Sequence, residues 1–399
     1  MNNTRERAFY LIGLPAGHGA VDAGTAALWI IAPFIAASMG LTSTQVGLIF
    51  TVMAVSAGMT HIPASLVGET RFRGIFLLST FWWVAGAYLA ASLAPSYLVL
   101  LVFVALASSG AAAWHPVAMG TLTERMPGQR AMALAVHYVG GSFMEVLAPI
   151  VAGVLLVFMD WRSVIQVTVV PALIMGMLFI RLHRRIRPPA MGSVSLQDLK
   201  VQARLVWKPT SLAGLGILGL HSMAMVGLWS MMPLYLVEER ELSSSVAGML
   251  FSVMVLAGSL GAVFLSRLLD KRGRKILTVS ALLVGATSPL LVLWAPTVPI
   301  MMAALMLAGF VVMGLLPALI ATVLSIVGGR QMVMIGLIMG AGEAVGALGA
   351  LLAGVAGEND LRLSLVVVSI VALGSALLAS IHPFTPAVSE HDTDGSIRP

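Results

Sequence analysis

The two halves of this chain repeat one another at an offset of about two hundred residues. Pro33 matches Pro233 at an offset of 200, and further along the register settles at 201. In that register small and turn-forming residues recur in pairs to the far end of each half: Gly47 with Gly248, Pro116 with Pro317, Thr121 with Thr322, Gly141 with Gly342 and Gly153 with Gly354. In so apolar a chain, a repeat of this length is typical of transporters built from two halves, whose substrate site lies between the halves near the bilayer midplane.

The composition places most of the chain in a membrane. Of its 399 residues, 59% are hydrophobic, 10% are charged and none is cysteine, which excludes disulfides and thiolate metal sites. Each half has six continuous apolar stretches long enough to cross a hydrocarbon core of about 30 Å as helices, whereas a β-barrel would need short alternating strands. We predict spans near residues 9–38, 45–67, 75–93, 97–122, 131–158, 163–181, 210–237, 244–266, 276–295, 300–326, 332–356 and 363–381.

These spans predict an all-α membrane protein with twelve transmembrane helices in two six-helix bundles. The predicted divisions are an N-terminal bundle over residues 1–181, a cytoplasmic linker over 182–209, a C-terminal bundle over 210–381 and a polar tail over 382–399. The composition of the tail is that of a disordered cytoplasmic segment.

The distribution of basic residues predicts the orientation. Of the 23 Lys and Arg, 20 fall in the N-terminus, the even-to-odd loops, the linker or the tail, and only Arg162, Arg240 and Arg362 lie on the other side. By the positive-inside rule both termini are cytoplasmic, in the inner (plasma) membrane of a bacterium. The charges are dispersed along the membrane edges, so the net charge of +6 reflects the topology of the chain in the membrane. We therefore expect a lipid bilayer as partner and no nucleic-acid partner.

One cytoplasmic loop carries a family motif. Residues 266–275 resemble the loop between the second and third helices of the major facilitator superfamily, in which basic residues and a glycine follow an acid. Residues 65–74 form a degraded copy, with Phe72 in place of the glycine, for which ordinary positive-inside charge is the alternative explanation. In that family the acid caps a neighbouring helix and is held by arginines, which keeps one face shut. The resemblance implies a gating loop of Glu69, Arg73, Asp270, Arg272 and Arg274.

A narrower resemblance covers about the first 160 residues. His18 and Asp22 in the first helix, Trp114-His115-Pro116 in the fourth, and two adjacent glycines in the fifth are similar to the fosmidomycin-resistance branch of the superfamily. Val117 stands where that branch usually has a glutamate, so no role of that glutamate can be transferred. The resemblance implies multidrug-like efflux driven by proton entry. It also implies two halves related by a pseudo-twofold axis along the membrane normal, rocking about a cavity lined mainly by helices one, four, seven and ten.

Ionisable residues inside the spans are the candidates for proton coupling. Asp22, Glu145 and Glu343 lie near the centres of their helices, where an ionised carboxylate costs on the order of 3 kcal/mol. His18 lies four residues before Asp22 and therefore on the same helix face, so that the two titrations are coupled. Asp22 is our first choice for coupling, His18 its tuning partner, and Glu145 and Glu343 the next candidates. The alternative for either glutamate is a structural lock between the halves.

Aromatic and histidine residues are the candidates for the cavity wall. We predict this role for Trp29, Trp114, His115, His137, Tyr138, His221 and Trp229. Two of these have structural alternatives. His221 can simply bond a backbone carbonyl, and His115 directly precedes Pro116, whose missing N–H frees a carbonyl one turn back.

The absence of basic residues from the spans, away from their ends, favours one class of substrate. Carriers of phosphates or dicarboxylates need a fixed positive charge, so the sequence favours a neutral or cationic, partly apolar small molecule, exported in exchange for protons. The alternative is proton-linked uptake of a small metabolite or organic acid. We expect a monomer with no cofactor, no metal and no enzymatic activity, because hydrolase and phosphate-loop motifs are missing. An intramembrane hydrolase using Asp22 and His18 is the remaining enzymatic alternative.

Overall fold

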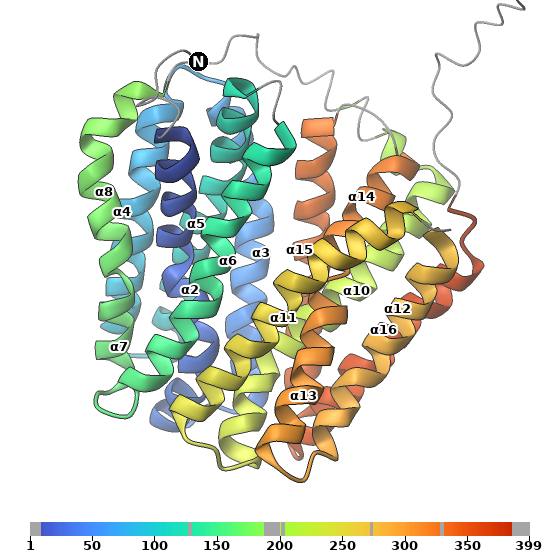
Figure 1. The fold of residues 1–399 in the computed structure, drawn as a ribbon. Helices are drawn as coiled ribbons and strands as arrows, with labels where there is room; N and C mark the ends of the chain where they lie inside the picture. The colour runs from blue at the N-terminus through green and yellow to red at the C-terminus, as the bar shows by residue number, and fades with distance from the viewer. Residues whose placement is uncertain are drawn as a thin grey trace, which may run out of the picture.

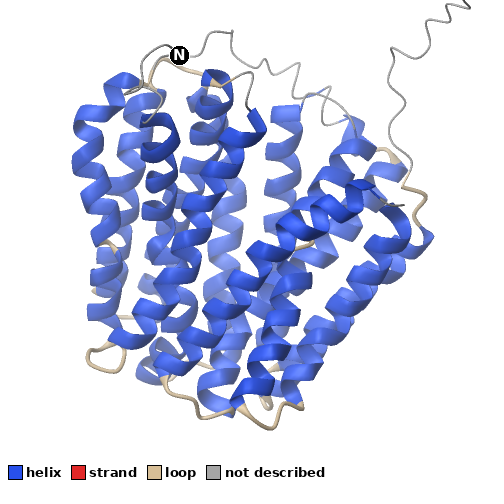
Figure 2. Ribbon diagram, viewed as in Figure 1, coloured by secondary structure: helices blue, strands red, loops and turns tan. Residues whose placement is uncertain are grey.

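The described part of the chain is helical throughout. The computed structural model describes residues 9–126, 130–186, 200, 204–271, 274–327 and 331–384, and shows helices joined by short loops (Figure 2). Twelve helical segments within these residues are long and apolar enough to cross a membrane. The predicted all-α architecture is therefore confirmed, whereas most of the predicted linker and tail lies outside the described residues.

The elements follow the repeat. The N-terminal half contains η1 (Phe9–Gly13), α2 (Leu14–Met39), α3 (Ser43–Gly68), α4 (Arg73–Ser92), α5 (Tyr97–Arg125), α6 (Arg130–Leu155), α7 (Trp161–Thr168), α8 (Val170–Leu182) and η3 (His183–Arg185). The C-terminal half contains α10 (Pro209–Leu234), η4 (Tyr235–Glu239), α11 (Ser244–Lys271), α12 (Arg274–Leu293), α13 (Val298–Ala308), η5 (Gly309–Met313), α14 (Leu316–Val327), α15 (Gln331–Ala356) and α16 (Leu361–Ile381).

Side-chain caps fix several helix starts. Thr42 caps α3 by accepting from the N–H of Gln45, whose side chain accepts from the N–H of Thr42 in return. Asp160 caps α7 and Asp360 caps α16, again at an offset of 200. The carboxylates satisfy backbone N–H groups that have no partner within the helix, which sets where each span begins.

The two halves meet through two equivalent helix pairs. Helix α3 packs along α15, and α11 packs along α6. In the repeat, α3 corresponds to α11 and α6 to α15, so the second pair reproduces the first with the halves exchanged. In Figure 1 the N-terminal half (blue to green) and the C-terminal half (yellow to red) approach one another at the end opposite the N-terminus and diverge toward the end that carries it.

Repeated glycines allow the closest approach. A Cβ placed on Gly354 would lie 2.6 Å from the carbonyl oxygen of Ser43, and one on Gly248 would lie 2.5 Å from that of Pro149. Each of these glycines also faces a glycine of the other half: Gly354 faces Gly47, and Gly248 faces Gly153. Small residues at membrane helix crossings let backbones come into direct contact, so the matched glycines of the sequence repeat mark where the halves close on each other.

Polar contacts add to the closure at this end. The hydroxyl of Ser43 donates to the carbonyl of Gly354 over 2.7 Å, and the N–H and hydroxyl of Thr44 donate to the carboxylate of Glu358. These bonds hold the pKa of Glu358 below its usual value, so the carboxylate is charged at neutral pH and sits favourably at the N-terminus of α3. We call this end, which carries Ser43, Gly248 and Glu358, the sealed face.

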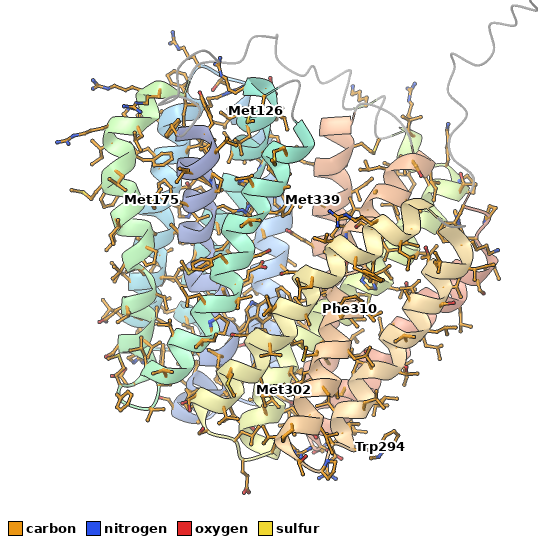
Figure 3. All side chains as sticks on the ribbon, in the orientation of Figure 1. Met126, Met175, Trp294, Met302, Phe310 and Met339 are labelled. Atoms are coloured by element: carbon orange, nitrogen blue, oxygen red, sulfur yellow. The ribbon has the colours of Figure 1, made fainter. Side chains whose placement is uncertain are left out.

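Apolar side chains cover the outside of both bundles, as expected for a surface in contact with lipid. Figure 3 shows Trp294 projecting from the edge of the molecule just after α12, where its side chain is largely exposed. Trp207 is similarly exposed just before α10, near the other end of the same half. Tryptophans at the two ends of membrane helices are typical of the bilayer interfaces.

Candidate functional site

A cavity of about 180 Å³ lies between the halves. Of the residues predicted for coupling or for the cavity wall, six line it: Asp22, Trp29, His115, Glu145, Trp229 and Glu343. Helices α2, α5 and α10 contribute to the lining as the resemblance implied, but α3, α6, α11 and α15 contribute as well. None of the described residues that line the cavity comes from the expected tenth span, which covers α13 to α14. None of those lining residues is Lys or Arg.

Asp22 is the centre of a histidine cluster at one wall of the cavity. One carboxylate oxygen lies 3.0 Å from Nε2 of His18 and the other lies 3.5 Å from Nε2 of His115. The side chain of Asp22 is almost completely buried. The contact between His18 and Asp22 is the one that their spacing of four predicted, whereas His115 comes from another helix. A buried carboxylate between two imidazoles is suited to holding and exchanging a proton.

His137 contacts His18 on the side of the cluster away from the cavity. Its backbone carbonyl accepts a hydrogen bond from Nδ1 of His18 over 2.8 Å, and its ring stacks on the His18 ring at a centroid distance of 4.2 Å. Its side chain is 0% exposed and does not reach the cavity. His137 therefore contacts His18 and is not among the residues that line the cavity.

Glu343 is held across the two halves. Its carboxylate lies 2.9 Å from Nε2 of His61, so that α15 and α3 are joined within the cavity lining. A lock between the halves was the predicted alternative for Glu343, but the sequence does not indicate His61 as its partner. The two residues are 282 positions apart, and no local pattern connects them.

Glu145 lines the cavity from α6, on the N-terminal side. It lies about two helical turns from His137 along that helix. The cavity therefore gathers three carboxylates, Asp22, Glu145 and Glu343, whose mutual repulsion is relieved by protons or by a cation.

Two tryptophans related by the repeat form an aromatic floor. Trp29 stacks on Phe50 with ring centroids 4.1 Å apart, and it meets Trp229 edge to face at 5.4 Å. Phe251 also lines the cavity beside Trp229. The floor offers apolar and π surface to a ligand, in agreement with the predicted wall positions of Trp29 and Trp229.

Three predicted wall residues lie elsewhere. Trp114 is 0% exposed and packs between Phe81 and Phe179, because neighbouring helix positions point about 100° apart and His115 takes the cavity side. Tyr138, the next residue along α6, is 50% exposed, and its ring centroid lies 6.3 Å from that of His137. His221 is buried inside the C-terminal half, beside the backbone of Val312. None of these three is among the residues that line the cavity.

The N-terminal copy of the gating loop is arranged around Glu124, which lies outside the predicted gating residues. Arg73, at the start of α4, is 2% exposed and donates to both carboxylate oxygens of Glu124 near the end of α5, over 2.7 and 3.1 Å. Its Nε also donates to the carbonyl of Gly68. Glu69 directly follows α3. The arginine therefore ties the ends of three helices together.

The C-terminal copy of the loop stays a prediction. Asp270 lies in the last turn of α11 and Arg274 begins α12, but their side chains and all of Arg272 lie outside the described residues.

Replacing Glu124 by glutamine should destabilise the protein. The buried guanidinium of Arg73 would lose its counter-charge, and an uncompensated buried charge typically costs about 3 kcal/mol or more. We expect the thermal unfolding midpoint of the detergent-solubilised protein to fall by several degrees. Arg71→Ala, at an exposed neighbouring arginine, is the matched control and should leave the midpoint unchanged. Equal midpoints for Glu124→Gln and the wild type would show that the pair contributes nothing to stability.

Comparison with known proteins identifies the family. A model described as Major Facilitator Superfamily matches residues 16–235 and 214–396. The chain therefore belongs to the major facilitator superfamily, and it is a multi-pass membrane transporter rather than an enzyme.

Individual relatives are distant. The chain is 24% identical over 328 residues to the uncharacterized MFS-type transporter YfnC of Bacillus subtilis, covering 81% of this chain and 80% of that protein. It is 24% identical over 254 residues to a probable sugar efflux transporter of Helicobacter acinonychis, and the match spans 63% of each chain.

Solved structures share the fold at low identity. A bacterial homologue of the human lysosomal transporter Spinster, in an inward-facing unoccupied conformation, has a TM-score of 0.79 at 15% identity, covering 96% of this chain and 98% of the other. The nucleoside transporter NupG has a TM-score of 0.76 at 10% identity, covering 93% and 98%. At these identities the likeness establishes the fold alone.

Proposed function

We propose that this transporter exports a neutral or cationic, partly apolar small molecule in exchange for protons. The observation that carries the proposal is the composition of the cavity, where three carboxylates and an aromatic floor face one another with no Lys or Arg among the described lining residues. An anion entering it would meet repulsion in a low-dielectric site, whereas a cation or neutral molecule would not. The similarity to a probable sugar efflux transporter supports export, as does the resemblance to the fosmidomycin-resistance branch.

Asp22 is the proposed point of coupling. It lines the cavity and contacts both His18 and His115, so a proton bound in this cluster alters the charge that a substrate meets. Protons and substrate would therefore exclude one another. Glu145 and Glu343 would carry further charge, and separation of Glu343 from His61 would accompany the rocking of the halves.

Alternating access provides the proposed transport cycle. The positive-inside rule puts the basic loops on the cytoplasmic side of a bacterial inner membrane. The sealed face is then external, and the opposite end opens toward the cytoplasm. The cycle would break the glycine crossings at the sealed face and close the halves at the Arg73 end. Each chain has its own cavity, so a monomer would be sufficient for transport.

The size of the cavity restricts the substrate. At about 180 Å³ it is smaller than the roughly 300–1000 Å³ of sites for drug-sized ligands. A small substrate fits this state directly, and a larger one would require the halves to move further apart. The alternative of proton-linked uptake of a small metabolite uses the same carboxylates, so the sign of the pH dependence separates the two.

For an exporter of this type, affinity should weaken as pH falls. We expect tetraethylammonium or a small neutral amphiphile to bind the purified protein more weakly by about tenfold between pH 8 and pH 5.5, a range that brackets the ordinary histidine pKa. The measurement is calorimetry in detergent, with benzoate as the anionic comparison. Tight binding of benzoate that strengthens toward acid would contradict export and support uptake.

A further inference from the structure

We propose that His18, His115 and His137, together with Asp22, form a binding site for a divalent transition metal of the Zn²⁺ class. The three imidazoles come from α2, α5 and α6, and the nitrogen atoms available as ligands all lie within 4.8 Å of one another. Asp22 adds a carboxylate that already lies between His18 and His115. The site goes beyond the proposed transport function, because metal binding does not depend on the substrate or on the direction of transport.

His18 is oriented as a metal ligand would be. A carbonyl oxygen can only accept a hydrogen bond, so the contact of 2.8 Å with the His137 carbonyl places a hydrogen on Nδ1 of His18. The lone pair of Nε2 then points at the Asp22 carboxylate, 3.0 Å away. Two acceptors at this distance need a cation between them, either a proton or a metal ion. Histidines that bind metals usually donate their other ring N–H to a backbone carbonyl or carboxylate in this manner.

The side chain of His137 also indicates a ligand at this site. Its side chain is completely buried, and neither of its ring nitrogens has a hydrogen-bond partner in the part of the chain that the structure describes. Buried imidazoles without partners are rare because desolvation of the ring nitrogens is not compensated. A metal ion shared with His18 and His115 would satisfy one of these nitrogens.

The ligand set selects the class of ion. Imidazole nitrogens with one carboxylate suit Zn²⁺, Co²⁺ and Ni²⁺, whereas Ca²⁺ and Mg²⁺ prefer shells made of oxygen. With bonds of about 2.0 Å, ligands around tetrahedral Zn²⁺ are about 3.3 Å apart, so the cluster must contract and the His137 ring must rotate out of its stack on His18. Asp22 and His115 line the cavity, which gives an ion a route to the site.

Metal titration of the purified protein tests the proposal. The protein, stripped with chelator and free of any polyhistidine tag, is titrated with Zn²⁺ by calorimetry and with Co²⁺ by visible absorption. We expect saturable binding of about one ion per chain and the intense absorption of tetrahedral Co²⁺. His137→Ala should weaken Zn²⁺ binding by about tenfold or more.

Two variants serve as controls. His221→Ala removes a buried histidine outside the cluster, and His61→Ala removes the histidine paired with Glu343. Neither should change Zn²⁺ affinity. The proposal is overturned if the wild type shows no saturable Zn²⁺ binding or no tetrahedral Co²⁺ spectrum, or if His61→Ala weakens binding and a monodisperse His137→Ala does not. The Co²⁺ spectrum of the wild type decides the matter even where a variant fails to fold.

Discussion

Replacing Gly354 by valine should open the sealed face. The new side chain would have to occupy space now filled by the Ser43 carbonyl, 2.6 Å from the position of its Cβ, and backbone cannot yield as a flexible side chain does. We expect the populations of the transporter to shift away from the state in which this face is closed. Because the repeat places Gly248 in the equivalent crossing, Gly248→Val should have the same effect.

The shift can be measured with spin labels across the sealed face. The chain contains no cysteine, so labels at Leu93→Cys and Asn359→Cys report a single distance between the halves. Double electron–electron resonance should show a longer distance in the glycine variants. Gly86→Val is the matched control, because a Cβ at this exposed position meets nothing within 4 Å. An unchanged distance in both glycine variants would contradict the assignment of these crossings as the closure.

Asp22→Asn should abolish proton coupling while the protein still folds. Asparagine keeps the shape of the side chain and removes the charge that His18 and His115 contact. We expect substrate-driven proton movement in proteoliposomes to fall by about tenfold or more, to the level of liposomes without protein. Substrate binding should also lose most of its pH dependence.

Asp360→Asn is the matched control for this variant. Asp360 caps α16 outside the cavity, and asparagine caps helices as well as aspartate does. The control should move protons at the rate of the wild type. Undiminished proton movement in well-folded Asp22→Asn would remove Asp22 from the mechanism.

The membrane architecture was predictable because it rests on local properties of the chain. Continuous apolar stretches determine helices when no water is present to satisfy the backbone, and all twelve predicted spans coincide with helices. The contact between His18 and Asp22 was predictable for a similar reason, since a spacing of four places both on one helix face. The glycine repeats were visible in the sequence, but their position at the crossings between the halves was not.

Contacts between distant helices could not be predicted in this way. The pairs His61 with Glu343 and Arg73 with Glu124 depend on how helices pack, and no periodicity within one helix encodes them. The rotation of each helix about its own axis could not be predicted from the sequence either. Trp114 and His115 are adjacent in the sequence, yet only His115 faces the cavity.

The direction of proton flow tests the central claim most directly. Wild-type protein is reconstituted in proteoliposomes with a pH-sensitive dye inside, and an outward gradient of tetraethylammonium, a small cation that does not cross lipid unaided, is imposed without a proton gradient. Exchange predicts that the interior acidifies as the cation leaves, and that Asp22→Asn abolishes this change. An interior that becomes more alkaline as substrate leaves would mean that proton and substrate travel together, and would contradict the account.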